Sequence, residues 1–162
     1  MNLHIVLHEP EIPQNTGSIG RTCMAIGAHL HLIRPLGFSL KDPYLKRAGL
    51  DYWNNLELSV HEGWGRFRDA WPEERLWFFT TKAQKSYDEV VFGDSAFLVF
   101  GKESRGIPNH LLREKTQQCL RIPMAARARS LNLSVSVGIA AYEALRQRRF
   151  DGLSATDPEK RL

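Results

Sequence analysis

The stretch FLVFGKESRGIP, residues 97–108, joins an apolar run to a polar loop that is bounded by glycines. Residues 121–134 repeat this form, with a short apolar run up to Ile122 and then a loop rich in arginine, serine and asparagine. Each pattern predicts a buried strand that ends in a loop and leads into a helix. Because ligands of open α/β sheets bind outside the carboxyl ends of the strands, we expect these two loops to form one cofactor site.

The rest of the chain alternates between apolar runs and helical patterns. The apolar runs predict strands at residues 3–7, 29–33, 56–60, 76–79, 96–100 and 119–122. Helices are predicted from a cap at Asn15 or Thr16 to Gly27, and at residues 44–48, 64–71, 107–115 and 132–149. This alternation predicts an α/β fold, with a mostly parallel sheet and helices on both faces. We expect a single domain over residues 1–150 and a polar C-terminal tail over residues 151–162.

Composition limits the classes of function. The 162 residues are 43% hydrophobic and 25% charged, which fits one globular domain with its own core. A net charge of +4 and a pI near 9.3 indicate an anionic partner, nucleic acid first, although many ordinary enzymes carry such a charge. Cys23 and Cys119 are far apart and predict reduced core thiols. With no signal peptide pattern and no run of membrane-spanning length, we expect a soluble, cytoplasmic protein.

Several common sites are excluded because their motifs are missing. No GxGxxG follows the first strand, which excludes ordinary dinucleotide binding. Lys102 is followed by Glu103 rather than by serine or threonine, so this loop is not a phosphate-binding loop, and no GxSxG of a serine hydrolase is present. The histidines form no HExxH, and a metal at His29 and His31 would need further ligands, so we expect no metal.

Polar side chains gather instead at the predicted strand ends. They are Asn15, Arg21, Glu103, Arg105, Arg127, Arg129, Ser130 and Asn132. Arginines beside asparagine and serine fit contacts with phosphate and ribose, although arginines also simply solvate loops. Arg21 and Arg105 lie beside glycines at strand–helix junctions, which favours a functional role for both. The four tryptophans could stack on bases, but core or interface positions are more common for this residue.

Three stretches together resemble the motifs of a known family. Residues 10–22, 100–108 and 122–134 resemble, in order, motifs 1, 2 and 3 of the SPOUT RNA methyltransferases, in the SpoU or TrmH-like branch. With RAGLDYW at residues 47–53 and no added RNA-binding domain, the chain is similar to the small stand-alone tRNA (cytidine(34)-2'-O)-methyltransferases. Two residues depart from the family pattern. Lys102 stands where many relatives have proline, and Val135 stands where close relatives often have asparagine.

The resemblance implies a C-terminal trefoil knot, a homodimer and S-adenosylmethionine held in the knot. The cofactor-binding residues that it implies are Phe79, Gly101, Glu103, Ile122, Ser130 and Leu131. It also implies that Arg21 is catalytic. Because a guanidinium stays protonated, we expect Arg21 to clamp the target ribose and to stabilise a developing oxyanion rather than to act as a base. The residues expected to bind RNA are Asn15, Arg105, Arg127, Arg129 and Asn132.

The implied reaction moves a methyl group from S-adenosylmethionine to the ribose 2'-hydroxyl of the wobble nucleotide in the tRNA anticodon, cytidine 34 or modified uridine 34. The alternatives are another position in tRNA or rRNA, and a non-catalytic RNA-binding module that has kept the fold. The predicted helix over residues 132–149 carries a stripe of small residues, and we expect this helix at the dimer interface. A dimer could then bring Arg21 of one subunit to the cofactor of the other.

Overall fold

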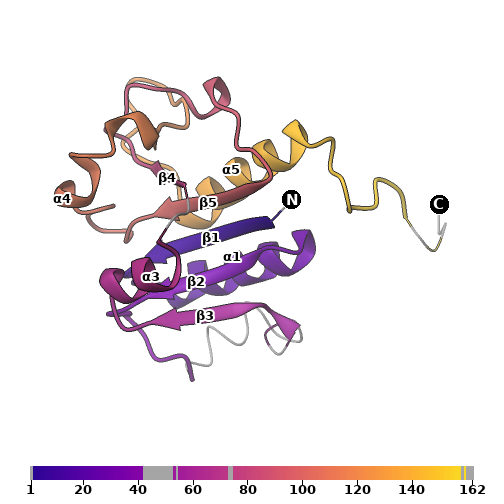
Figure 1. Cartoon of the computed structure of the whole chain (residues 1–162), viewed down its shortest axis with the longest axis horizontal. Coiled ribbons are helices and arrows are strands. Elements are labelled where there is room, and N and C mark those ends of the chain that lie inside the picture. Colours follow the sequence, from indigo (N-terminus) through magenta and orange to yellow (C-terminus); the bar gives the residue numbers. More distant parts are fainter. Residues whose placement is uncertain (1, 42–52, 54, 73–74, 158, 160–162) are drawn as a thin grey trace.

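The computed structural model describes residues 2–41, 53, 55–72, 75–157 and 159, and its centre is one parallel sheet (Figure 1). In chain order the strands are β1 (Asn2–His8), β2 (His29–Ile33), β3 (Leu58–His61), β4 (Leu76–Phe79), β5 (Ser95–Phe100) and β6 (Cys119–Leu120). Their order across the sheet is β3-β2-β1-β5-β4-β6, and each neighbouring pair is parallel. The predicted parallel sheet is confirmed.

Helices cover both faces of the sheet, as predicted. On one face, α1 (Pro13–Ile26) packs beside α5 (Leu133–Gln147), and on the other lies α3 (Trp64–Ala70) (Figure 1). The connections hold the short helix α4 (Asn109–Leu112) and two 3-10 turns, η2 (Tyr87–Glu89) and η3 (Thr116–Gln118). Among the described helices, none has both the length and the hydrophobicity needed to cross a bilayer.

The strands place their side chains alternately in two apolar cores. Ile5 and Leu98 lie in the core that α1 and α5 cover, whereas the next residues along their strands, Val6 and Val99, pack with Phe67 of α3. All five side chains are fully buried. Burial on both faces explains why these strands are continuous apolar runs in the sequence.

Helix α1 begins earlier than predicted. Its first residue is Pro13, and Ile12 precedes it in an extended conformation, so the expected cap at Asn15 or Thr16 is wrong. Proline suits the first helical turn because the N–H that it lacks has no partner there. Asn15 and Thr16 are therefore buried within the helix. The predicted end of the helix is confirmed, since Gly27 has the φ of 65° that a left-handed cap requires.

Other predicted boundaries are longer than the observed elements. Strand β6 ends at Leu120, and α4 forms only a small part of the helix expected over residues 107–115. After α4 the Lys115 N–H bonds to the Leu112 carbonyl, three residues back, so the chain tightens into a 3-10 turn. The helix predicted over residues 44–48 lies outside the described residues.

The small-residue stripe of α5 faces the interior of its own chain. Ala140, Ala141 and Ala144 are fully buried, and α5 packs against β5 and α1. These alanines are therefore already covered within their own chain, and an interface along this helix stays a prediction that depends on its other residues. Exposed apolar residues of α5 lie away from the stripe, at Val135 and Tyr142, each 49% exposed.

Candidate functional site

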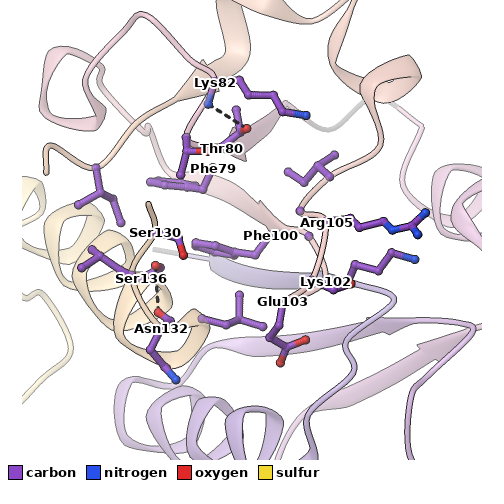
Figure 2. Close-up of a pocket in the computed structure, with 18 of the residues that line it drawn as sticks. Phe79, Thr80, Lys82, Phe100, Lys102, Glu103, Arg105, Ser130, Asn132 and Ser136 are labelled. Carbon is purple, nitrogen blue, oxygen red and sulfur yellow. Dashed lines mark hydrogen bonds between the residues drawn. The ribbon is translucent and has the colours of Figure 1, made fainter. Parts of the chain in front are cut away.

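The loops that follow three neighbouring strands line one cavity at the carboxyl edge of the sheet (Figure 2). Residues 79–82 continue from β4, residues 100–107 from β5, and the third wall comes from residues 121–133, after β6. The cavity has a volume of about 530 Å³, which is within the range of sites for small ligands and cofactors. The two loops that the sequence singled out therefore meet, and the loop after β4 completes the enclosure.

Two phenylalanines form a flat apolar wall of this cavity. Phe79 ends β4 and Phe100 ends β5, and the two residues are register partners in the paired strands. Register partners share a face of the sheet, so the rings stack, with centroids 4.9 Å apart and an angle of 15° between planes (Figure 2). A flat aromatic face of this kind suits a planar ring such as a nucleobase.

The loop after β5 turns so tightly that its first residue must be glycine. A Cβ on Gly101 would lie 2.0 Å from the carbonyl carbon of Gly106 and 2.1 Å from the nitrogen of Ile107. The turn closes with the Gly106 N–H donating to the Lys102 carbonyl at 2.8 Å, and Gly106 itself has a φ of 68°. Since two glycines permit this turn, the loop can present its backbone, rather than side chains, to a ligand.

A hydrogen-bond network joins this loop to the starts of α1 and α5. The Glu103 carboxylate accepts from the Glu11 backbone N–H at 2.8 Å and from the Asn15 side-chain amide at 2.9 Å. Asn15 in turn accepts from the Asn132 amide at 3.0 Å. Asn132 caps α5, because its side-chain oxygen accepts from the Ser134 N–H at 2.8 Å. Residues from all three sequence motifs are thus direct partners.

The same loop is held by both acidic residues that follow β1. The Glu11 carboxylate accepts from the Ser104 hydroxyl and backbone N–H, each at 2.9 Å, and these two bonds hold the pKa of Glu11 below its ordinary value. The Lys102 ammonium lies 2.8 Å from the Glu9 carboxylate. Lys102, which replaces the proline of many relatives, therefore has an ionic partner that proline could not have.

Basic side chains contribute to the cavity lining. They are Lys82, Lys102, Arg105 and Arg121. Lys82 donates to the Asn109 side chain at 2.7 Å, and Arg121 donates to the Thr81 carbonyl. Arg105 is exposed and points away from the phenylalanine pair (Figure 2). This set of charges favours a ligand or partner that carries negative charge.

Most of the predicted site residues lie at this cavity. Those that line it are Asn15, Phe79, Gly101, Glu103, Arg105, Ile122, Ser130, Leu131 and Asn132. Arg21 is exposed on α1, and Arg127 and Arg129 are exposed in the loop before α5. These three arginines do not line the described cavity.

Sequence reasoning missed several lining residues. They include Thr80, Lys82, Phe100, Arg121, Met124 and Ser136. The signal for Phe100 and Thr80 was available, because both lie where a predicted strand ends, at the edge where ligands of α/β sheets bind. Ser136 lies one turn inside α5, and its place at the cavity depends on how that helix is oriented, which the sequence pattern does not give.

Comparison with known proteins identifies the class of this chain. The sequence profile of the SpoU rRNA Methylase family matches residues 2–142. The tRNA (cytidine(34)-2'-O)-methyltransferase of Saccharophagus degradans is 48% identical over 150 residues, which are 92% of this chain and 97% of that protein. The chain belongs to the SpoU methylase family.

Two solved structures share the fold. One, described as giving structural insights into the 2-OH methylation of C/U34 on tRNA, matches with a TM-score of 0.87 and 48% identity, covering 91% of this chain and 97% of that one. The other is the SpoU methyltransferase AviRb from Streptomyces viridochromogenes in complex with the cofactor AdoMet. It matches with a TM-score of 0.81 and 27% identity, covering 92% of this chain and 61% of that one.

Proposed function

We propose that this chain transfers a methyl group from S-adenosylmethionine to the ribose 2'-hydroxyl of the wobble nucleotide of tRNA, cytidine 34 or modified uridine 34. The observation that carries the proposal is the meeting of all three motif loops in one cavity, in a chain 48% identical over 150 residues to a protein named for this activity. The fold neighbour described by its C/U34 methylation supports the same nucleotide.

The residues around the cavity fit S-adenosylmethionine, which a SpoU neighbour binds. The stacked pair Phe79 and Phe100 offers an apolar surface to an adenine, and the turn at Gly101 leaves its backbone accessible. The residues that would hold the cofactor are Phe79, Gly101, Glu103, Ile122, Ser130 and Leu131. The cofactor supplies an activated methyl group, so the chain has to align the reacting atoms and to ease loss of the hydroxyl proton.

Arg21 is proposed as the catalytic residue that a second subunit supplies. Its guanidinium would clamp the target ribose and its phosphate and stabilise the developing oxyanion. Since Arg21 does not line the cavity of its own chain, a homodimer is the simplest way to bring it to a cofactor. The exposed apolar residues Val135 and Tyr142 of α5, with Leu131 in the loop before it, support such an interface in place of the buried alanine stripe.

RNA binding is proposed at the exposed arginines Arg105, Arg127 and Arg129. Exposed guanidiniums near the cavity suit the phosphates of an anticodon stem and loop. Contacts of Asn15 and Asn132 with RNA stay predictions, and the hydrogen bond between them supports a second role, in shaping the cavity edge.

A C-terminal trefoil knot is also part of the proposal. Two observations support it. Strand β4 lies between β5 and β6, both of which come later in the chain, and residues 101–107 line the same cavity as residues 121, 122, 124 and 130–133. A second candidate function is methylation of ribosomal RNA, which the description of the family profile favours.

Labelled S-adenosylmethionine with total tRNA, followed by mapping of the methylated nucleotide, tests the proposed function. We expect 2'-O-methylation at position 34 and none on ribosomal RNA in a parallel reaction. Label at another nucleotide, or only in ribosomal RNA, would contradict the assignment of the substrate. Binding of both S-adenosylmethionine and tRNA without turnover would support a non-catalytic module instead.

A further inference from the structure

Four histidines lie together on the face of the sheet that α3 covers, away from the cofactor cavity. His4 of β1 is the register partner of His29 in β2, and His31 follows on the same face of β2. His61 of β3 joins them through a hydrogen bond between its Nε2 and the Nδ1 of His31, at 3.1 Å. Strands β1, β2 and β3 are adjacent in the sheet (Figure 1). The parallel pairing thus gathers residues that are far apart in the sequence.

Three of these side chains have donor atoms close enough to share one ion. One ring nitrogen from each of His4, His29 and His31 lies within 4.8 Å of the others. The closest pair is His4 Nδ1 and His31 Nε2, at 2.9 Å. Tetrahedral zinc with Zn–N bonds of about 2.0–2.1 Å requires nitrogens about 3.4 Å apart, so this pair needs only a small separation.

The second nitrogens of two of these rings already face partners. His31 Nδ1 is bound to His61, and His29 Nδ1 lies 4.0 Å from the Glu57 carboxylate. Histidines that ligate metals commonly have their other nitrogen held by a hydrogen bond or a carboxylate, which fixes the tautomer and the ring orientation. The nitrogens that would turn to an ion are then His31 Nε2, which now bonds to His4 Nδ1, and His29 Nε2, which now bonds to the Ser59 hydroxyl.

Aromatic side chains hold the inner rings in place. His4 stacks on Phe97 with centroids 3.9 Å apart and 5° between the planes, and it contacts Trp71 at 5.1 Å. The edges of Phe67 and Trp71 pack against His31. These ring contacts hold the two imidazoles close to each other, as a shared ion would require.

We propose that His4, His29 and His31 form a binding site for one divalent transition-metal ion of the zinc type, which joins β1 to β2. Imidazole nitrogens suit zinc, and water would take the fourth position. His29 now stacks on His31 at 4.1 Å and bonds to the Ser59 hydroxyl, so its ring must turn to share the ion. The His29 side chain is 22% exposed and is thus open to an entering ion.

Metal binding to the tag-free full chain tests this proposal, independently of methyl transfer. After treatment with EDTA and desalting, the protein is titrated with Zn²⁺ by calorimetry and with Co²⁺ by visible absorption. We expect one ion per chain, intense Co²⁺ bands of tetrahedral type, and a higher Tm with Zn²⁺. His29→Ala should weaken binding at least about tenfold, whereas His110→Ala, at an exposed histidine on α4, should bind like the unaltered chain.

Two results would overturn the site. One is the lack of saturable binding of either ion to the unaltered chain, which would leave the cluster as a hydrogen-bonded layer of neutral imidazoles. The other is equal affinity in the unaltered chain and in His29→Ala, which would place any bound ion elsewhere. Far-UV circular dichroism shows whether His29→Ala is folded, and the titration of the unaltered chain decides the first result without any variant.

Discussion

The side-chain amide of Asn15 lies 2.9 Å from the carboxylate of Glu103, although the two residues are 88 positions apart in the chain. Their bond links helix α1 to the loop that lines the cavity after β5. Glu103 also accepts from the Glu11 backbone N–H, so one carboxylate binds two donors, both at the start of α1 or just before it. The shape of the cavity therefore depends on a side chain that is itself fixed by the start of α1.

Glu103→Gln should loosen this connection. The neutral amide has only one acceptor oxygen, so one of the two donors loses its partner, and we expect the free energy of unfolding to fall by about 1–2 kcal/mol. S-Adenosylmethionine should bind about tenfold more weakly. Urea denaturation and calorimetry measure the two effects. The exposed Glu114→Gln is the matched control, and equal behaviour of both variants would refute a positioning role for Glu103.

Gly101→Ala should abolish cofactor binding. Its methyl group would fall 2.0 Å from the carbonyl carbon of Gly106, so the turn must open and displace the cavity wall. Gly65→Ala is the control, because a Cβ at that position in α3 meets nothing within 4 Å, and it should change stability by no more than about 1 kcal/mol. Calorimetric titration with S-adenosylmethionine distinguishes them. Cofactor binding by Gly101→Ala at normal affinity would show that the turn can relax.

Arg21→Ala should slow methylation of tRNA by a factor of about 10²–10³ while cofactor affinity stays nearly constant, since it removes a group that stabilises developing charge. Arg66→Ala removes an exposed arginine of α3 and controls for the loss of positive charge. Single-turnover methylation and calorimetry give the two quantities. Turnover within a few-fold of the unaltered rate would rule out the proposed role.

Mixing inactive chains tests whether Arg21 acts across a dimer. A heterodimer of Arg21→Ala and Gly101→Ala pairs one intact cavity with an intact Arg21 from the other subunit. If Arg21 acts in trans, co-expression of the two variants restores part of the activity. If it acts within its own chain, each subunit stays defective and the mixture stays inactive.

Val135→Asp should shift the chain toward monomers in sedimentation velocity. Val135 is 49% exposed on α5, and a carboxylate buried at an interface there would be unpaired. Val91→Asp, at a valine that is 80% exposed in the connection before β5, is the control and should sediment like the unaltered chain. Identical sedimentation of both variants would exclude this part of α5 from an interface.

Buried histidines predict a loss of stability in acid. Burial, with neighbouring histidines, lowers the pKa of His31 to about 2 and that of His4 to about 4, from the ordinary value of 6.5. Below about pH 6.5 the unfolded chain therefore binds more protons than the folded one. The contribution of these histidines to the free energy of unfolding is fully present above this pH and is lost as the pH falls below it. We expect a fall of about 1.4 kcal/mol per pH unit for each of the two histidines between about pH 6 and 4.

Urea denaturation at several pH values, in EDTA to exclude metal binding, measures this slope. His110→Ala should keep the slope, because its imidazole is exposed. An unfolding free energy that stays constant from about pH 7 to about pH 4.5 would mean that the cluster accepts protons without cost.

Much of the fold could be predicted because local patterns determine it. The continuous apolar run at residues 96–100 predicts a strand buried on both faces, and Gly27 gives the end of α1. The start of α1 was missed because proline has opposite effects at two places in a helix. It breaks the interior of a helix but is favourable as the first residue, where Pro13 lies. The alanine stripe did not show what covers it, because small residues favour close packing against any surface, whether of the same chain or of a partner.

A site residue could be predicted only where its position at the end of a strand was enough to place it at the cavity. Gly101 and Ile122 could be placed at strand ends from the sequence, whereas the bond between Asn15 and Glu103 depends on β1 pairing with β5. The histidine cluster depends on pairing in the same way. His4 and His31 are 27 residues apart, and only the register of β1 with β2 makes them neighbours.

The central place of β1 has a consequence for synthesis of the chain. Strand β1 is made before β2 and β5, and β2 can pair with one of its edges early, but its other edge waits for β5, which ends at Phe100. Until then an apolar strand edge stays open, and such edges attract other chains. The enclosure of the cavity waits longer still, since Asn132 must be made before it can bond to Asn15. The closed cavity can therefore form only after Asn132 has been made.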